Sequence, residues 1–273
     1  MPSPTVTVRG VTVPSLGYGT WQVEGEAAYE GVLDALELGY RHIDTAFMYG
    51  NEAEVGRGIA DSPVPREDIW LTTKVWLGDA APDDLRRSAE GSLERLGVDQ
   101  VDLLLLHWPN PDVPIADTIN AFVGLREEGL IREFGVSNFP SALLREAVAH
   151  GPVFTDQVEY HAYLPVDEIK AVCDEHDVLL TAYSPFAHGQ LLDDPVLADI
   201  AADRGATPGQ VALAWLLEQP RVCTIPKASS HERRMENLAA LGLELSAGER
   251  ERISALGARR LRTGDPDFAP VWD

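Results

Sequence analysis

Short runs of β-branched and aliphatic residues alternate along the chain with longer amphipathic stretches, whose apolar residues recur at helical spacing. The apolar runs predict eight strands, at residues 16–19, 41–44, 69–74, 101–107, 131–136, 155–158, 178–183 and 222–226. The stretches between them predict helices, among them residues 26–38, 82–96, 115–128 and 166–175. Eight strands that alternate with helices are typical of a single α/β domain of the (β/α)8 barrel type, a TIM barrel.

Both ends of the chain carry additions to this repeat. The runs TVTV and VTV flank Arg9 and Gly10, which predicts an N-terminal β-hairpin with a two-residue turn. Additional helices are expected within residues 187–218, 232–241 and 246–256. A polar tail with Phe268 and Trp272 follows. No linker or low-complexity stretch interrupts the pattern, so we expect one domain over residues 1–273.

The composition narrows the classes of partner. Hydrophobic residues make up 45% of the 273 residues, which is enough for a full core and excludes a largely disordered chain. The 44 acidic residues outnumber the 22 basic ones, so the net charge is −22. Nucleic acid and anionic membrane surfaces are therefore not expected as partners, because both select clustered positive charge.

The basic residues are almost all arginine. The only lysines are Lys74, Lys170 and Lys227, which leaves 19 arginines among the 22 basic residues. A high-GC genome would explain the arginine but not so large a negative charge. We therefore expect a halophilic protein, in which salt screens the repulsion among carboxylates.

Neither the cysteines nor the apolar segments indicate export or a membrane. Cys173 and Cys223 cannot form a disulfide framework, and neither belongs to a CxxC pair. The N-terminal residues show no signal peptide, and the longest apolar run, near VDLLLLHW, is shorter than the roughly 18 residues of a membrane span. We expect a cytoplasmic protein.

Polar residues follow the predicted strands at the end where barrels carry their reactive groups. Asp44 follows the second strand, Lys74 ends the third and His107 ends the fourth, while Tyr49 lies five residues after Asp44. An unpaired charge at the end of so apolar a strand would be costly, which favours pairing among these groups. Taken singly, Asp44 would be interpreted as a helix N-cap and Tyr49 as a packing residue.

Seven motifs make the sequence recognisable. They are, in order, GYRHIDTAFMYGNEAEVGRGI, TTKVW, LLLHWP, GVSNF, QVEYH, AYSPF and IPKASSHERRMEN. Together they resemble the aldo-keto reductase superfamily, particularly its prokaryotic diketogluconate and aldehyde reductases, and the resemblance extends from Gly17 to Asn237. It implies a monomeric enzyme that reduces an aldehyde or ketone, a small carbonyl compound or keto-sugar, with NADPH.

The resemblance implies a catalytic tetrad of Asp44, Tyr49, Lys74 and His107. Hydride transfer leaves negative charge on the carbonyl oxygen, and Tyr49 would supply the proton, since a phenol stays protonated at pH 7. Lys74 would stabilise the developing phenolate, and Asp44 would keep Lys74 charged. His107 would orient the carbonyl by a hydrogen bond.

The same resemblance implies a nicotinamide site. Its residues would be Thr20, Ser137, Asn138, Gln157, Tyr183, Ser184, Pro185, Phe186, Lys227, Ala228, Ser229, Arg233, Glu236 and Asn237. Ser137, Asn138 and Gln157 would hold the neutral carboxamide, and Tyr183 would stack on the ring. Residues 184–186 would border the pyrophosphate, and residues 236–237 would face the adenine. A Rossmann fingerprint is not found, because GYGTWQ lacks the third glycine.

The segment after the eighth strand is expected to bind the adenosine 2′-phosphate. Ser229 and Glu232 have the spacing of a capping box, which predicts a helix N-terminus with free backbone N–H groups. Lys227 and Arg233 add positive charge, so NADPH is expected as the cofactor. The family commonly has serine where this chain has Ala228, so NADH is expected to bind too, though more weakly.

Four aromatic residues beside the catalytic motifs are expected to wall the substrate pocket. They are Trp21, Phe47, Trp76 and Trp108. The tail with Trp272 could cover this pocket. The remaining histidines show no metal-ligand spacing, and no metal is expected.

Two other function classes remain at this point. Lys74 could form a Schiff base, as in a lyase or aldolase, although the SNF, YSP and IPK motifs would then have no role. Borohydride trapping of a substrate adduct would detect that chemistry. The chain could also be a non-catalytic cofactor-binding barrel, which would have no reason to keep all four tetrad side chains.

Overall fold

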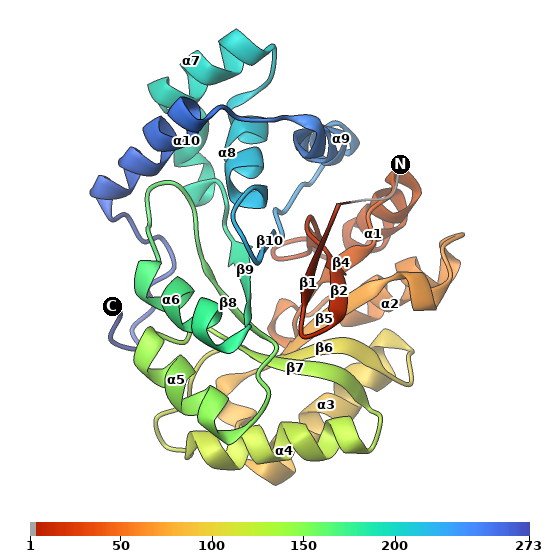
Figure 1. Ribbon diagram of the computed structural model, residues 1–273. Helices are drawn as coiled ribbons and strands as arrows, with labels where there is room; N and C mark the ends of the chain where they lie inside the picture. Colours follow the sequence, from red (N-terminus) through yellow and green to blue (C-terminus); the bar gives the residue numbers. More distant parts are fainter. Residues whose placement is uncertain (1–3) are drawn as a thin grey trace.

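The computed structural model describes residues 4–273, and its centre is a sheet of eight strands (Figure 1). The strands are β3 (Tyr18–Gly19), β4 (His42–Asp44), β5 (Trp70–Val75), β6 (Val101–Leu106), β7 (Ile131–Ser137), β8 (Thr155–Glu159), β9 (Leu179–Tyr183) and β10 (Val222–Thr224). Each pairs in parallel with the next strand along the chain. The carboxyl ends of all eight strands therefore lie at one end of the sheet.

The sheet closes on itself between its first and last strands. Parallel bridges join Leu16 to Thr224 and Gly19 to Lys227. Gly19 approaches the neighbouring chain so closely that a Cβ there would lie 2.6 Å from the carbonyl oxygen of Ile225, so only glycine fits. These contacts complete a barrel and confirm the predicted (β/α)8 fold.

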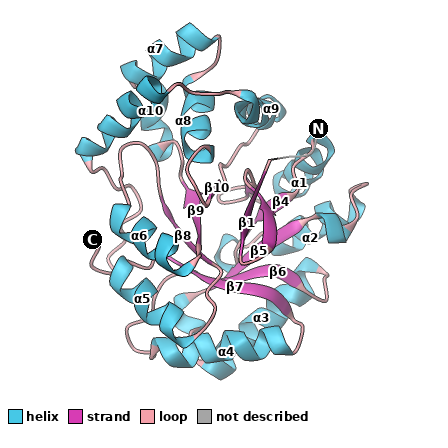
Figure 2. Cartoon of the chain, viewed as in Figure 1, coloured by secondary structure: helices cyan, strands magenta, loops and turns pink. Residues whose placement is uncertain are grey.

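Helices surround the barrel (Figure 2). They are α1 (Glu26–Leu38), α2 (Glu52–Asp61), α3 (Pro82–Leu96), α4 (Ile115–Glu127), α5 (Ser141–His150), α6 (Asp167–His176), α7 (Pro195–Arg204), α8 (Pro208–Leu217), α9 (His231–Ala239) and α10 (Ala247–Ser254). Two helices, α7 and α8, lie between β9 and β10, and α10 follows the last barrel helix. The predicted segment 187–218 thus holds two α-helices after a 3-10 segment, Ala187–Asp193.

Helix α3 illustrates why these segments are helical. It begins with Pro82, whose fixed φ and missing N–H suit a first helical turn. Its apolar side chains Leu85, Ala89 and Leu93 recur every four residues and are buried. Gly97 ends it in the left-handed region at φ 66°, a conformation that glycine adopts without strain.

The N-terminal hairpin closes the amino end of the barrel. Strands β1 (Thr5–Val8) and β2 (Val11–Pro14) pair antiparallel across Arg9 and Gly10. Both turn residues have positive φ, as a two-residue hairpin turn requires, which confirms the predicted hairpin. Its apolar face, with Val8 and Val13, packs in one cluster with Leu103 and Leu105 of β6.

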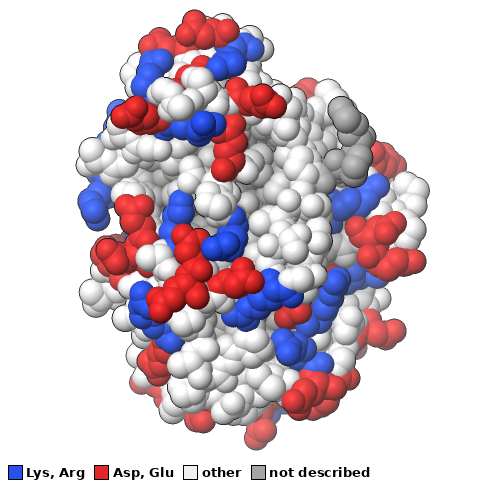
Figure 3. Space-filling view, in the orientation of Figure 1, with Lys and Arg blue, Asp and Glu red and all other residues white. Residues whose placement is uncertain are grey.

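The surface carries both signs of charge. Figure 3 shows acidic and basic side chains interspersed on one face of the molecule. Among residues 4–273, no helix is long and apolar enough to cross a membrane.

Candidate active site

The four tetrad residues meet at the carboxyl end of neighbouring strands. Asp44 is the last residue of β4, Lys74 the last but one of β5, and His107 follows β6 directly. The Lys74 ammonium lies 2.5 Å from Asp44 Oδ1, and donates to the Thr45 carbonyl at 2.8 Å and to Tyr49 Oη at 3.3 Å. The structure therefore brings a cation, a carboxylate and a phenol together in one hydrogen-bonded group.

The protonation states in this group are those that proton donation needs. Burial by itself would lower the pKa of Lys74, but Asp44 and Tyr49 outweigh it, and the net pKa is raised. Burial raises the pKa of Tyr49, and the Lys74 charge offsets only part of that effect. Lys74 is thus an ammonium ion and Tyr49 a neutral phenol at pH 7.

His107 completes the group through its ring. The ring lies edge-on to Tyr49, with centroids 5.7 Å apart, and its backbone carbonyl accepts from Asn138 Nδ2 at 3.0 Å. Burial, followed by the Lys74 charge, lowers the pKa of His107 well below its ordinary value. A neutral imidazole has one N–H, so His107 can donate a single hydrogen bond to an oxygen.

The predicted carboxamide residues form a second connected group on the next three strands. Ser137 Oγ donates to the Gln157 carbonyl at 2.7 Å, and Tyr183 Oη donates to Asn138 Oδ1 at 2.7 Å. Gln157 Nε2 donates to Asp44 Oδ2 at 2.8 Å, which ties this group to the tetrad. Asp44 is therefore engaged by Lys74 and Gln157 and is not a helix cap.

The loop after β9 is backbone-strained. Ser184, Ala187 and His188 all have positive φ, between 48° and 52°, without being glycine. Such residues persist only where surrounding contacts fix them, and they concentrate at ligand-binding sites. The loop contains the predicted pyrophosphate residues 184–186, and His188 stacks on Trp21 at a centroid distance of 5.7 Å.

The segment between β10 and α9 exposes two cations. Lys227 and Arg233 are both exposed, and neither takes part in an ion pair with any residue of the described chain. Both cations are therefore free to contact an external anion. They lie in the segment where the 2′-phosphate is predicted to bind, and that assignment stays a prediction.

The predicted capping box at this helix is wrong in register. Helix α9 begins at His231, and its N-cap is Ser230, whose hydroxyl accepts from the Arg233 N–H at 3.3 Å. Because the helix begins one residue later than expected, Ser229 lies outside it and Glu232 is not at the N3 position. Ser229 remains exposed beside the cap.

The other residues predicted here are tied into the protein. Ala228 is buried, and its carbonyl accepts from Arg234 Nη1 at 3.0 Å. Glu236 Oε1 accepts from Thr207 Oγ1, and Asn237 is 6% exposed. Contacts inside the chain therefore fix the positions of these residues, in addition to any contact they make with a ligand.

Three of the four predicted pocket residues lie near the tetrad or the loop above it. Trp76 meets the His107 ring edge-on at 5.4 Å, and Phe268 of the tail lies 5.6 Å from Trp76 and 5.4 Å from Trp108. Trp21 lies under His188. Phe47 is placed elsewhere, because its ring packs under the Arg95 guanidinium of α3, 4.8 Å away.

Two supporting residues lacked a signal strong enough to single them out. Asn51 Oδ1 accepts from Thr45 Oγ1, and Asn51 Nδ2 donates to the carbonyls of Thr20 and Val23, so it fixes the backbone around Asp44. Thr20, predicted to contact the cofactor, donates to the Asp44 carbonyl at 3.1 Å. The second missed residue, Glu159, lies two positions after Gln157 in β8 and thus on the same inward face.

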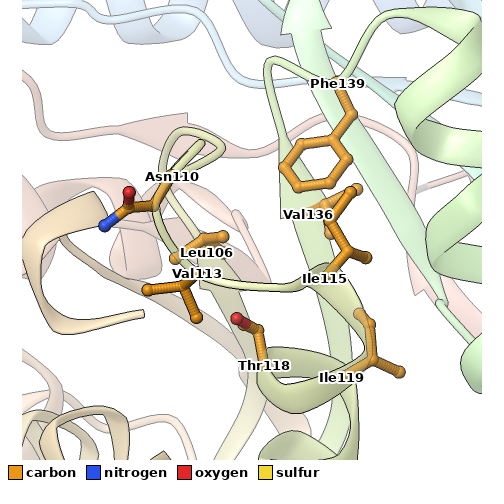
Figure 4. A pocket seen from close by; sticks show the side chains of 8 residues that line it. All are labelled: Leu106, Asn110, Val113, Ile115, Thr118, Ile119, Val136 and Phe139. Atoms are coloured by element: carbon orange, nitrogen blue, oxygen red, sulfur yellow. The ribbon is translucent and has the colours of Figure 1, made fainter. Parts of the chain in front are cut away.

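The small cavity beside β6 and β7 offers no rival site. Figure 4 shows a small cavity of about 10 Å³, lined by Leu106, Asn110, Val113, Ile115, Thr118, Ile119, Val136 and Phe139. That volume holds at most about one water molecule. Within residues 4–273, no group of three or more histidine, cysteine, aspartate or glutamate side chains is placed to hold a metal.

Comparisons with known proteins agree with this geometry. A model of the aldo/keto reductase family matches residues 15–258. The methylglyoxal reductase DkgB of Escherichia coli O157:H7 is 38% identical over 268 residues, which cover 96% of this chain and 100% of that protein.

Solved structures extend the comparison. A candidate 2,5-diketo-D-gluconic acid reductase B matches with a TM-score of 0.96 at 40% identity, over 98% of this chain and 97% of that one. The thermostable aldo-keto reductase Tm1743, solved with the inhibitor epalrestat, has a TM-score of 0.88 at 39% identity, over 93% of this chain and 100% of that one. The chain therefore belongs to the aldo/keto reductase family, whose members are oxidoreductases that act on carbonyl groups.

Proposed function

We propose that this enzyme reduces an aldehyde or ketone to the alcohol with NADPH, and that Tyr49 is the acid. The observation that carries the proposal is the Lys74 ammonium, which bonds both Asp44 and Tyr49 beside a neutral His107. This is the arrangement that protonation of a carbonyl oxygen requires: a neutral acid, a fixed cation and a separate hydrogen-bond donor.

Each side chain has a defined task in this chemistry. The bound nicotinamide would supply a hydride to the carbonyl carbon. The carbonyl oxygen then carries the electron pair, and Tyr49 Oη donates its proton to it. Lys74 stabilises the resulting phenolate at 3.3 Å, Asp44 keeps Lys74 charged, and His107 orients the oxygen.

The same observation disfavours a Schiff-base lyase. A lysine that attacks a carbonyl must be a neutral amine, which requires a lowered pKa. The pKa of Lys74 is raised because Asp44 and Tyr49 outweigh burial. All three ammonium protons also have acceptors, which stabilises the protonated form, and a protonated amine has no free electron pair with which to attack a carbonyl.

The donor set fits the cofactor we propose. Ser137, Asn138 and Gln157 present hydroxyl and amide groups suited to a neutral carboxamide, with Tyr183 alongside. The unpaired cations Lys227 and Arg233 would hold the 2′-phosphate, which favours NADPH. Ala228 provides no hydroxyl for that phosphate, so NADH should also support turnover, more weakly.

The proposal also covers the enzyme's setting. The net charge of −22 with only three lysines supports a protein adapted to concentrated salt. Two buried free cysteines fit a reducing compartment such as the cytoplasm. We propose a single domain over residues 1–273 that works as a monomer, which size-exclusion chromatography in salt would check.

The test is direct turnover. Purified protein in molar KCl is offered aldehydes and keto-sugars, and the loss of NADPH absorbance is followed. Methylglyoxal and 2,5-diketogluconate come first, because relatives carry these names. Product alcohol should form in step with NADPH loss, whereas borohydride trapping of a substrate adduct on Lys74 with no NADPH use would refute the proposal.

A further inference from the structure

The C-terminal tail, defined as residues 260–273, lies across the end of the barrel that carries the tetrad. Phe268 packs against Trp76 and Trp108, which follow β5 and β6, and Figure 1 shows the C-terminus beside α5 and α6. The Leu261 N–H donates to the Tyr163 carbonyl at 3.0 Å, and two larger sets of hydrogen bonds also hold the tail there.

The first anchor is Glu159, the last residue of β8, whose side chain is fully buried. Its carboxylate accepts from the Thr263 N–H at 2.8 Å, Thr263 Oγ1 at 2.6 Å, the Gly264 N–H at 2.7 Å and His161 Nε2 at 2.9 Å. Hydrogen bonds to a carboxylate are about twice as strong as neutral ones. Most donors to this buried charge belong to the tail, so moving the tail away would leave the Glu159 carboxylate buried without its partners.

Glu159 keeps this charge at every pH where the enzyme would work. Burial raises its pKa, but the bonds from His161, Thr263 and Gly264 outweigh burial and bring the pKa to about 2. The anchor is therefore constitutive and does not switch with pH.

The second anchor is the last residue of the chain. Asp273 Oδ2 accepts from the Ser141 N–H at 2.9 Å, and Asp273 Oδ1 accepts from Ser141 Oγ at 2.8 Å. Helix α5 begins after Pro140, which has no side chain that can cap it. Asp273 supplies that missing cap from the far end of the sequence.

Between the anchors the tail contributes two aromatic rings. Phe268 contacts Trp76 and Trp108, and Trp76 in turn contacts the His107 ring. Trp272 lies 6.2 Å from Trp108. The tail thus packs on the two tryptophans that neighbour His107, while Phe268 itself stays 47% exposed.

We propose that Glu159 is a positioning residue that sets substrate specificity. It touches no reacting group; it fixes Thr263 and Gly264 so that Phe268 closes the pocket over His107. This inference rests on the proposed function, because the pocket matters only if His107 and Tyr49 serve a carbonyl. A large aromatic aldehyde reaches Phe268 and benefits from contact with it, whereas a two- or three-carbon aldehyde does not.

The test begins with Glu159→Gln, which keeps the shape and loses the charge. We expect the KM for 4-nitrobenzaldehyde to rise about tenfold, as the loss of one to two charge-assisted bonds allows. The KM for propionaldehyde and the NADPH Kd should change less than about twofold. Because a buried variant can fail to fold, Thr263→Val removes only the hydroxyl from the other side of the bond, and should shift the same KM about two- to fivefold. Thr7→Val on the exposed hairpin is the matched control.

A double-mutant cycle shows whether Glu159 acts through Phe268. Phe268→Ala alone should also raise the KM for 4-nitrobenzaldehyde, and Glu159→Gln should then add no further increase. Fully additive effects, or an equal loss of kcat with both aldehydes, would overturn the inference. If wild-type protein reduces neither aldehyde, the proposed function itself fails; if it reduces both and no variant changes the KM ratio, only the inference fails.

Discussion

Tyr49→Phe is the sharpest test of the proposed acid, because the structure limits what else the change can do. Within residues 4–273, the only hydrogen bond of the phenol joins it to the Lys74 ammonium at 3.3 Å. Lys74 keeps its bonds to Asp44 and to the Thr45 carbonyl in the variant, and the ring keeps its edge-on contact with His107. The substitution therefore removes one proton donor and leaves the surrounding geometry in place.

The magnitudes separate a catalytic role from a structural one. A positioned acid contributes about 10²- to 10⁴-fold to the rate, so kcat/KM should fall by at least about 100-fold, or roughly 2.7 kcal/mol of barrier. Loss of one long hydrogen bond should cost at most about 1.5 kcal/mol of unfolding free energy. The effect on the barrier is then larger than the effect on stability, and the two are measured independently.

The assay follows NADPH consumption over a range of aldehyde concentrations, which gives kcat/KM, and urea unfolding is measured on the same preparations. NADPH binding, followed by fluorescence titration, should be unchanged, since the phenol bonds none of the carboxamide residues. Tyr29→Phe, which removes an exposed hydroxyl bonded to Asp61, is the matched control and should keep full activity. Turnover of the Tyr49 variant within a factor of a few of wild type would refute the assignment.

Three further outcomes are expected. Arg233→Ala should weaken NADPH binding about tenfold and leave NADH binding unchanged, because a charge-assisted bond to the 2′-phosphate is lost. Arg86→Ala is the control. Equal weakening of both cofactors in the Arg233 variant would mean that the phosphate binds elsewhere. The melting temperature should rise with KCl from about 0.1 M to several molar, as the Debye length falls from about 10 Å to below 3 Å, and a flat melting temperature would refute adaptation to salt. The kcat/KM for reduction should be constant between pH 6.5 and pH 10. The reason is that the pKa of His107 lies well below 6.5 and that of Tyr49 lies above 10, so the acid loses its proton only beyond this range. An inflection within the range that disappears in His107→Gln would contradict a neutral imidazole.

The barrel was predictable because its signals are local. The strand at residues 101–106 is apolar apart from Asp102, and helices such as α3 carry their own start and stop residues. The pairing of Lys74 with Asp44 was also predictable, because parallel strands bring their carboxyl ends together and a buried cation must find a carboxylate. The N-terminal hairpin was predictable from its two turn residues, Arg9 and Gly10, in the same way.

The errors concern features that the local sequence does not determine. Ser229 and Ser230 both precede an acidic helix start, and only the chain's approach from β10 decides that Ser230 caps α9. Phe47 lies two residues before Tyr49, but the 3-10 helix Phe47–Tyr49 turns its ring toward Arg95 of α3. The role of Glu159 depends on residues more than 100 positions later, with no periodicity that links them.

The choice of lysine at position 74 follows from the site's geometry. An ammonium has three N–H donors on a compact, mobile head, and Lys74 uses them on Asp44 Oδ1, the Thr45 carbonyl and Tyr49 Oη. A guanidinium has five donors in a rigid plane, so two would be left unsatisfied in this fully buried position, at a cost in folding free energy. The chain uses arginine for 19 of its 22 basic residues but has a lysine here. Only the compact ammonium group fits between the Asp44 carboxylate and the Tyr49 phenol, which becomes a phenolate when it donates its proton.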